Sequence, residues 1–157
     1  MLQFNTILCP TDFSDPSLEG IKTANELALR FSAEIILINV VPPIPVFSMP
    51  EPNLAPVFDA PAYQTEISKS AEKRLQHLAQ DHISEEIRYR SRVIVGDPAG
   101  EIVDFARREG VDVIVISTHG HTGWKRLLVG SVTEKVIRYA RCCVLSVPRP
   151  EHETPRD

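Results

Sequence analysis

The sequence has few of the features that mark disulfide-stabilised, metal-binding, membrane or secreted proteins. Three of its 157 residues are cysteine, an odd number without a C-x-x-C pair, which argues against a disulfide framework or a zinc site. No apolar run approaches the roughly 18 residues of a membrane-spanning helix. Residues 1–5 lack the basic start and the apolar block of a signal peptide. We therefore expect a cytoplasmic protein with no membrane partner.

Basic residues are also fewer than acidic ones, with 17 lysines and arginines against 21 aspartates and glutamates. The formal net charge is -4 and the isoelectric point is about 5.7, whereas nucleic-acid-binding surfaces are usually basic, so we expect no nucleic-acid partner. The chain is otherwise ordinary for a globular protein, with 43% hydrophobic and 24% charged residues. Its length suits one domain with a substantial core. We predict a single domain over residues 1–149 and a polar tail over residues 150–157.

Motifs of several well-known nucleotide and catalytic sites are missing as well. There is no G-x-x-x-x-G-K-[ST] loop and no G-x-G-x-x-G fingerprint after the first apolar run. Asp12 has no acidic neighbour, and Pro148 rather than lysine follows the last apolar run, which disfavours a phosphorelay receiver domain. His119 and His121 have no third ligand nearby and make a weak zinc signal. No Ser/His/Asp or Cys/His set stands out for nucleophilic catalysis.

What the sequence does contain is a regular alternation of apolar runs and amphipathic helical patterns. The apolar runs, which we predict to be strands, are residues 6–9, 34–41, 88–95, 111–116 and 143–147. The helical stripes between them begin at Ile21, Ile67, Ile102 and Val132, with apolar residues at three-to-four spacing. The second and fourth runs are apolar on both faces, as central parallel strands are. This order predicts an α/β fold with a mostly parallel, doubly wound sheet.

Ligands of such sheets bind beyond the carboxyl ends of the strands, where the strand order reverses. The residues at these ends are Pro10, Thr11, Asp12, Val40 and Ser117. The Asp12 carboxylate could accept hydrogen bonds from a nucleobase amine or a ribose hydroxyl, or it could form an Asx turn. Because Asp15 followed by proline predicts the N-cap of the next helix, Asp12 is not needed for capping.

The loop after the fourth run is the most informative segment. Between Ser117 and Glu134 it contains three glycines and a cluster of hydroxyl groups, and a helical pattern follows. Small residues let backbone N–H groups approach a ligand, and a helix N-terminus adds unpaired donors and partial positive charge. The loop therefore predicts a phosphate site. Ser131 and Glu134 match a capping box, which explains Ser131 structurally without excluding phosphate binding, and Thr133 could add a hydroxyl.

Two further segments leave alternatives open. Residues 42–61 hold seven prolines and read as a long, semi-extended loop, which is either a connector, a flap over the site or a docking segment for a partner. The adjacent Cys142 and Cys143 are either a redox pair or small apolar strand residues, and Cys9 closes an apolar strand in the same way.

Taken together, the segments from Phe4 to Pro148 resemble the universal stress protein family, in its nucleotide-binding branch. Residues 7–14 resemble the first strand of that family and its aspartate, and residues 95–98 resemble its G-x-P turn. The family's G-x2-G-x9-G-[ST] phosphate motif is matched by Ser117, Gly120, Gly130 and Ser131. Serine replaces glycine at the first position and would be penalised if that position required a positive φ.

The resemblance implies a fold and a set of site residues. The fold would be an open, doubly wound parallel sheet of five strands in the order 3-2-1-4-5, Rossmann-like, with helices on both faces. Asp12 and the backbone at Val40 would hold adenine and ribose, and the start of the last helix would hold the phosphates, with Mg²⁺ carried on them. The implied site consists of Pro10, Thr11, Asp12, Val40, Ile116, Ser117, Gly120, Gly130, Ser131, Val132 and Thr133.

The resemblance also implies a function and partners. We expect a switch in stress response or signalling that binds ATP, or ADP or AMP, with slow or no hydrolysis, because no general base can be named. A homodimer would form through the last strand, at Val144 to Val147, and a protein partner of unknown identity would read the switch. The alternative is a nucleotide-free dimer that acts through its dimer surface and the proline-rich loop. A true ATPase or a phosphoryl or nucleotidyl transferase is a third hypothesis.

Overall fold

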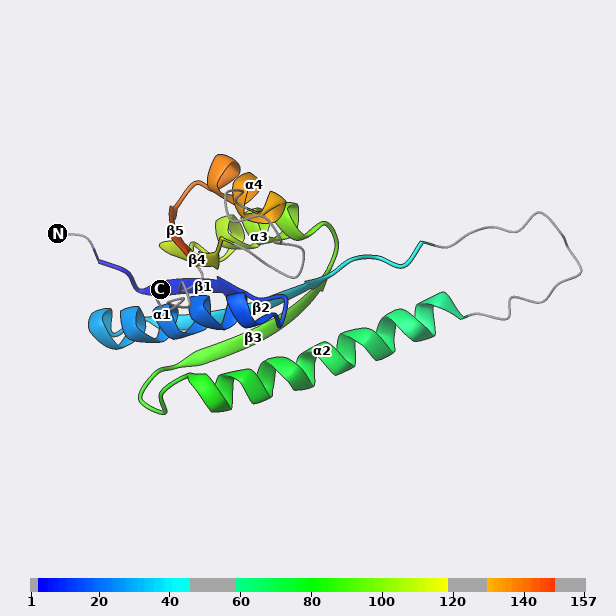
Figure 1. Ribbon diagram of the computed structural model, residues 1–157, viewed down its shortest axis with the longest axis horizontal. Helices are drawn as coiled ribbons and strands as arrows, with labels where there is room; N and C mark the ends of the chain where they lie inside the picture. Colours follow the sequence, from blue (N-terminus) through cyan, green and yellow to red (C-terminus); the bar gives the residue numbers. More distant parts are fainter. Residues whose placement is uncertain (1–2, 46–58, 119–129, 149–157) are drawn as a thin grey trace, which may run out of the picture.

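A computed structural model describes residues 3–45, 59–118 and 130–148, and within them nine elements alternate between strand and helix (Figure 1). All five strands are parallel and form one sheet in the order β3-β2-β1-β4-β5, which confirms the predicted class and strand order. The elements are β1 (Thr6–Pro10), α1 (Asp15–Phe31), β2 (Glu34–Val41), α2 (Ala60–His82), β3 (Tyr89–Val95), α3 (Pro98–Arg108), β4 (Val113–Ser117), α4 (Ser131–Tyr139) and β5 (Cys143–Val147).

The helices cover both faces of the sheet, as a doubly wound fold requires. Helices α1 and α2 lie on one face, and α3 and α4 lie on the other (Figure 1). Side chains of β2 alternate between the two cores, so that Ile35 and Leu37 pack with α1 and α2 while Ile36 and Ile38 pack with α3 and α4. All four are fully buried, and each such burial contributes about 1.5–3 kcal/mol.

Two helix starts differ from the predictions because local hydrogen bonds compete with capping. Asp15, predicted as an N-cap, is instead the first residue of α1, and Ser14 occupies the cap without a side-chain bond to the helix. The Ser14 hydroxyl donates to Asp12 Oδ1 instead. In α4 the N-cap is Gly130 rather than Ser131, and the predicted capping box is not formed, since the Glu134 carboxylate pairs with Arg138.

The proline-rich segment ends earlier than predicted, because α2 already begins at Ala60. Asp59 caps this helix by accepting a hydrogen bond from the Ala62 N–H at 3.0 Å, and Pro61 lies in the first turn, where proline is tolerated. Residues 46–58 of the proline-rich segment lie outside the described residues. The predicted end of α3 is confirmed, since Gly110 follows it with a φ of +63°.

The three cysteines are free thiols in different surroundings. Cys9 is fully buried in the core under α1, and burial raises the pKa of its thiol to about 12. Cys142 is half-buried, and burial raises the pKa of its thiol, whereas Cys143 is exposed on β5. Cys9 therefore behaves as a small core residue, as predicted. No helix among the described residues is long and apolar enough to cross a membrane.

Candidate functional site

A pocket of about 210 Å³ opens at the carboxyl ends of β1, β2 and β4, beside the first turns of α1, α3 and α4. This is where the strand order reverses, since the chain leaves β1 toward β2 on one side and β4 lies on the other. The pocket is lined by Pro10, Thr11, Asp12, Ser17, Ile38, Val40, Pro98, Ile102, Ile116, Ser117, Gly130, Ser131, Val132 and Thr133.

The structure brings nearly all of the sequence-predicted site residues into this one pocket. All of them line it except Gly120, which lies outside the described residues together with His119 and His121. Sequence reasoning missed Ser17, Ile38, Pro98 and Ile102. Pro98 was visible in the turn after β3 and Ile102 in a helical stripe, but their place in the pocket follows from the packing of α3 against β2.

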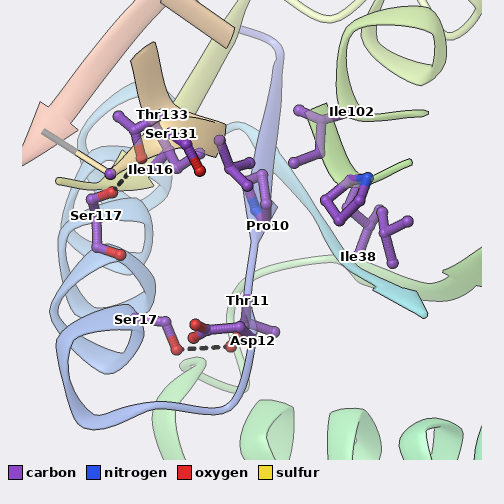
Figure 2. Close-up of a pocket in the computed structure, with 14 residues that line it drawn as sticks. Pro10, Thr11, Asp12, Ser17, Ile38, Ile102, Ile116, Ser117, Ser131 and Thr133 are labelled. Carbon is purple, nitrogen blue, oxygen red and sulfur yellow. Dashed lines mark hydrogen bonds between the residues drawn. The ribbon is translucent and has the colours of Figure 1, made fainter. Parts of the chain in front are cut away.

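One side of the pocket is apolar. Figure 2 shows the side chains of Ile38 and Ile102 on one side of the pocket and those of Ser117 and Thr133 on the other, with Pro10 between them. Ile38 is fully buried and Ile102 nearly so, and the wall that they form presents carbon rather than polar atoms. Such a surface suits the flat, largely apolar body of a heterocycle.

A second wall is formed by the turn between β1 and α1. Thr11 is buried and held on three sides: its N–H donates to the Ile38 carbonyl at 2.9 Å, Asn39 Nδ2 donates to its carbonyl at 2.8 Å, and its hydroxyl lies 2.8 Å from that of Ser17. These bonds fix the end of β1 to β2 and α1. The dashed Thr11–Ser17 contact in Figure 2 marks this wall.

Asp12 is the next residue in this turn, and it lines the pocket. It also forms an Asx turn, which is the second of the two roles predicted for it from the sequence. Its Oδ1 accepts the Ser14 N–H at 3.0 Å and the Ser14 hydroxyl. The two interpretations are therefore compatible, because the turn holds the carboxylate at the pocket wall. Asp12 is the single ionisable side chain among the described residues that line the pocket.

The third wall is the start of α4, which is tied to the end of β4. The Thr133 hydroxyl donates to the Ser117 carbonyl at 2.7 Å (Figure 2). The Gly130 N–H donates to the Thr118 carbonyl, also at 2.7 Å. Thr133 therefore joins α4 to the end of β4, and its hydroxyl hydrogen is already donated to the Ser117 carbonyl. Because the positive-φ residues other than glycine among the described residues are Phe13 and Ser32, serine at 117 carries no backbone penalty.

Gly130 lines the pocket at the start of α4, where the chain passes close to the Thr118 carbonyl. Its φ of -57° and ψ of 147° are available to any residue, so the backbone conformation does not require glycine. A Cβ placed there would meet the Thr118 carbonyl oxygen at 3.3 Å, which is tight. The first-turn N–H groups of α4 have no partner within a helix and carry partial positive charge, so this wall suits an anion.

The pocket therefore combines an apolar wall, a carboxylate and a helix start suited to an anion. This chemistry matches a ligand with a heterocycle, hydroxyl groups and a phosphate.

The comparison with known proteins agrees with the family resemblance found in the sequence. The model of the Universal stress protein family matches residues 3–148. Universal stress protein MJ0531 of Methanocaldococcus jannaschii is 36% identical over 150 residues, covering 96% of this chain and 85% of that protein. The solved structure of MJ0577, from the same organism, has a TM-score of 0.78 at 26% identity and covers 94% of this chain and 98% of that one. A universal stress protein solved in complex with cAMP has a TM-score of 0.61 at 23% identity, covering 93% and 98%.

Proposed function

Because the chain belongs to the universal stress protein family, we propose that its pocket binds ATP or another adenine nucleotide and that the protein acts as a nucleotide-dependent switch. The observation that carries this proposal is the meeting of Asp12, an apolar wall and the start of α4 in one pocket. The cAMP complex of a relative is compatible with this ligand class, although at 23% identity it shows the fold alone.

Each part of the pocket has a role in this proposal. The apolar wall with Ile38 and Ile102 packs against adenine, and the Asp12 carboxylate accepts hydrogen bonds from ribose hydroxyls or the adenine amine. The backbone N–H groups at the start of α4 and the Ser131 hydroxyl bind phosphate oxygens. Mg²⁺ would be carried by those phosphate oxygens.

Slow or no hydrolysis is part of the same proposal. An in-line attack on a phosphate needs a group that orients or deprotonates water close to the phosphoryl end. The carboxylate among the described lining residues, Asp12, lies in the β1–α1 turn rather than on α4, where the phosphates are placed. The protein would then report nucleotide binding through its surface instead of turning over substrate.

Thermal unfolding with and without ligand tests this proposal. MgATP at about 100 times its dissociation constant adds roughly 2.7 kcal/mol of stability, which should raise Tm by several degrees in a domain of this size. Mg²⁺ alone is the control and should leave Tm unchanged. A flat Tm at millimolar ATP, ADP and AMP would contradict the nucleotide site and favour the nucleotide-free interaction protein.

A homodimer through β5 belongs to the same proposal. This edge strand exposes Leu145 at 39%, and the neighbouring α4 exposes Ile137 at 48% and Tyr139 at 61%. An open strand edge with exposed apolar side chains is suited to pairing with another strand. A second copy of the chain would cover both.

Light scattering after size-exclusion chromatography tests the dimer. We expect a dimeric mass for the wild type and a monomeric mass for Leu145→Arg, because the arginine places a charge at the centre of the pairing edge. Val95→Arg is the matched control, since Val95 is 45% exposed on the opposite edge strand, β3, and its variant should stay dimeric. A monomeric wild type, or a dimer that survives Leu145→Arg, would rule out this interface.

A further inference from the structure

The turn that carries Asp12 contains an unusual backbone conformation. Phe13 has a φ of +65°, in the left-handed region where a bulky side chain is disfavoured. Such residues persist only where the surrounding structure holds them in place, and they cluster at binding sites. The contacts around Phe13 therefore show what keeps the turn in its shape.

Hydrogen bonds hold the backbone of the turn from inside. The Phe13 N–H donates to Thr11 Oγ1 at 3.0 Å, and the next N–H, that of Ser14, donates to Asp12 Oδ1 at 3.0 Å. The Ser14 carbonyl in turn accepts the Ser17 hydroxyl at 2.7 Å. These bonds fix Thr11 and Ser14 on either side of Phe13, but they do not reach its side chain.

The Phe13 ring is held from outside by α2. It is partly buried against the core under α1 and α2, and the guanidinium of Arg74 lies over its face, 3.9 Å from the ring centroid. Arg74 itself is exposed on α2 and does not line the pocket. A cation over an aromatic face is attracted to the ring electrostatically, so Arg74 holds the Phe13 ring from the side of α2.

We propose that Arg74 is a positioning residue for the nucleotide site, which holds Phe13 in its left-handed conformation and thereby keeps the Asp12 carboxylate at the pocket wall. The proposal rests on the nucleotide function stated above. Asp12 and Phe13 share a peptide bond, so a change of φ at Phe13 reorients the peptide that links them. Loss of the stack lowers the fraction of molecules with a binding-competent turn, and the apparent Kd rises in inverse proportion to that fraction.

Isothermal titration of the full chain with MgATP tests the proposal. Arg74→Ala should raise Kd by up to about five-fold, the upper limit set by the roughly 0.5–1 kcal/mol of an exposed cation–π contact. Arg74→Lys keeps a cation over the ring and should retain most of the affinity. Lys73→Ala removes a neighbouring exposed cation from α2 and is the control for a loss of general charge attraction.

A double-mutant cycle with Asp12→Ala separates positioning from a direct contact. If Arg74 acts through Asp12, Arg74→Ala should have no further effect on Kd once the carboxylate is gone. Equal losses in both backgrounds would instead mean that Arg74 contacts the nucleotide or acts by charge, and would overturn the positioning role. Unchanged affinity in Arg74→Ala alone would overturn it too, and would leave the nucleotide function standing.

Amide hydrogen exchange of the ligand-free protein gives a second, independent measurement. The Phe13 and Ser14 amides should exchange faster in Arg74→Ala than in the wild type, while amides in the middle of β2 stay unchanged. Equal exchange at Phe13 and Ser14 would overturn the proposal whether or not ATP binds. Failure of the wild type to bind any adenine nucleotide would overturn the nucleotide function and, with it, the role assigned to Arg74.

Discussion

Replacing Gly130 by valine should abolish ATP binding while the protein still folds. The backbone at Gly130 has ordinary dihedral angles, so the new side chain introduces no φ strain. Its Cβ, however, would lie 3.3 Å from the Thr118 carbonyl oxygen, and the two γ-methyl groups would extend further, at the pocket wall where α4 begins. The phosphates would then be held away from the N–H groups that the proposal assigns to them.

The expected rise in Kd can be estimated from the hydrogen bonds to the phosphates that would be lost. A hydrogen bond to a charged group contributes about 1.5–3 kcal/mol, so losing two of them raises Kd by roughly 100-fold or more. Titration with MgATP measures this directly, and the Tm rise caused by ATP should disappear with it. Wild-type affinity in Gly130→Val would mean that the phosphates do not bind at the start of α4.

Gly110→Ala is the matched control, because it should have the opposite pattern. Gly110 has a φ of +63°, and a Cβ added to it would meet no atom within 4 Å, so alanine fits the space but not the backbone. The variant should lose about 1 kcal/mol or more of stability, and its affinity for ATP should be unchanged because Gly110 is remote from the pocket. A loss of affinity in Gly130→Val together with a loss of stability in Gly110→Ala would show that Gly130 is needed for ligand binding and Gly110 for the backbone conformation.

Much of the fold can be predicted from the apolar runs and the helical stripes in the sequence. Strands β1, β2 and β4 are buried on both faces, so nearly every residue in them must be apolar, and such runs stand out from the helical stripes. The carboxyl ends of these strands are then enough to predict that Pro10, Asp12 and Ser117 are neighbours. Residues that reach the pocket from the side are harder to predict, since Pro98 and Ile102 enter it through the packing of α3 on the sheet.

Helix starts are less predictable, because short polar side chains have several partners within reach. Asp15 is the expected cap of α1, yet Ser14 takes that place and gives its hydroxyl to Asp12. Which residue caps α1 depends on the left-handed turn at Phe13, and phenylalanine rarely adopts that conformation. The same sequence-level rule fails at Ser131, where Gly130 caps α4 through its backbone alone. Local departures of this kind are concentrated around the pocket, as expected for a functional site.

The hydroxyl of Thr133 couples the stability of the fold to the site, and its removal should weaken both. Thr133 is 4% exposed and donates to the Ser117 carbonyl at 2.7 Å, which joins the first turn of α4 to the end of β4. Thr133→Val keeps the shape of the side chain and deletes this donor. Loss of one partner of a buried hydrogen bond costs about 1–3 kcal/mol, and we expect Tm to fall by roughly 2–10 °C.

Binding of ATP should weaken in the same variant, because the N–H groups of α4 would no longer be held against the end of β4. Thr133→Ser separates the two contributions, since it keeps the donor and loses only a methyl group. We therefore expect Thr133→Ser to bind ATP nearly as well as the wild type, with a slightly lower stability through the lost packing. If Thr133→Val binds like the wild type in spite of a lower Tm, the bond to Ser117 serves the fold alone. If both variants lose binding equally, the methyl group shapes the pocket as much as the hydrogen bond does. The contrast between the two substitutions thus decides whether the anchor between β4 and α4 is part of the nucleotide site.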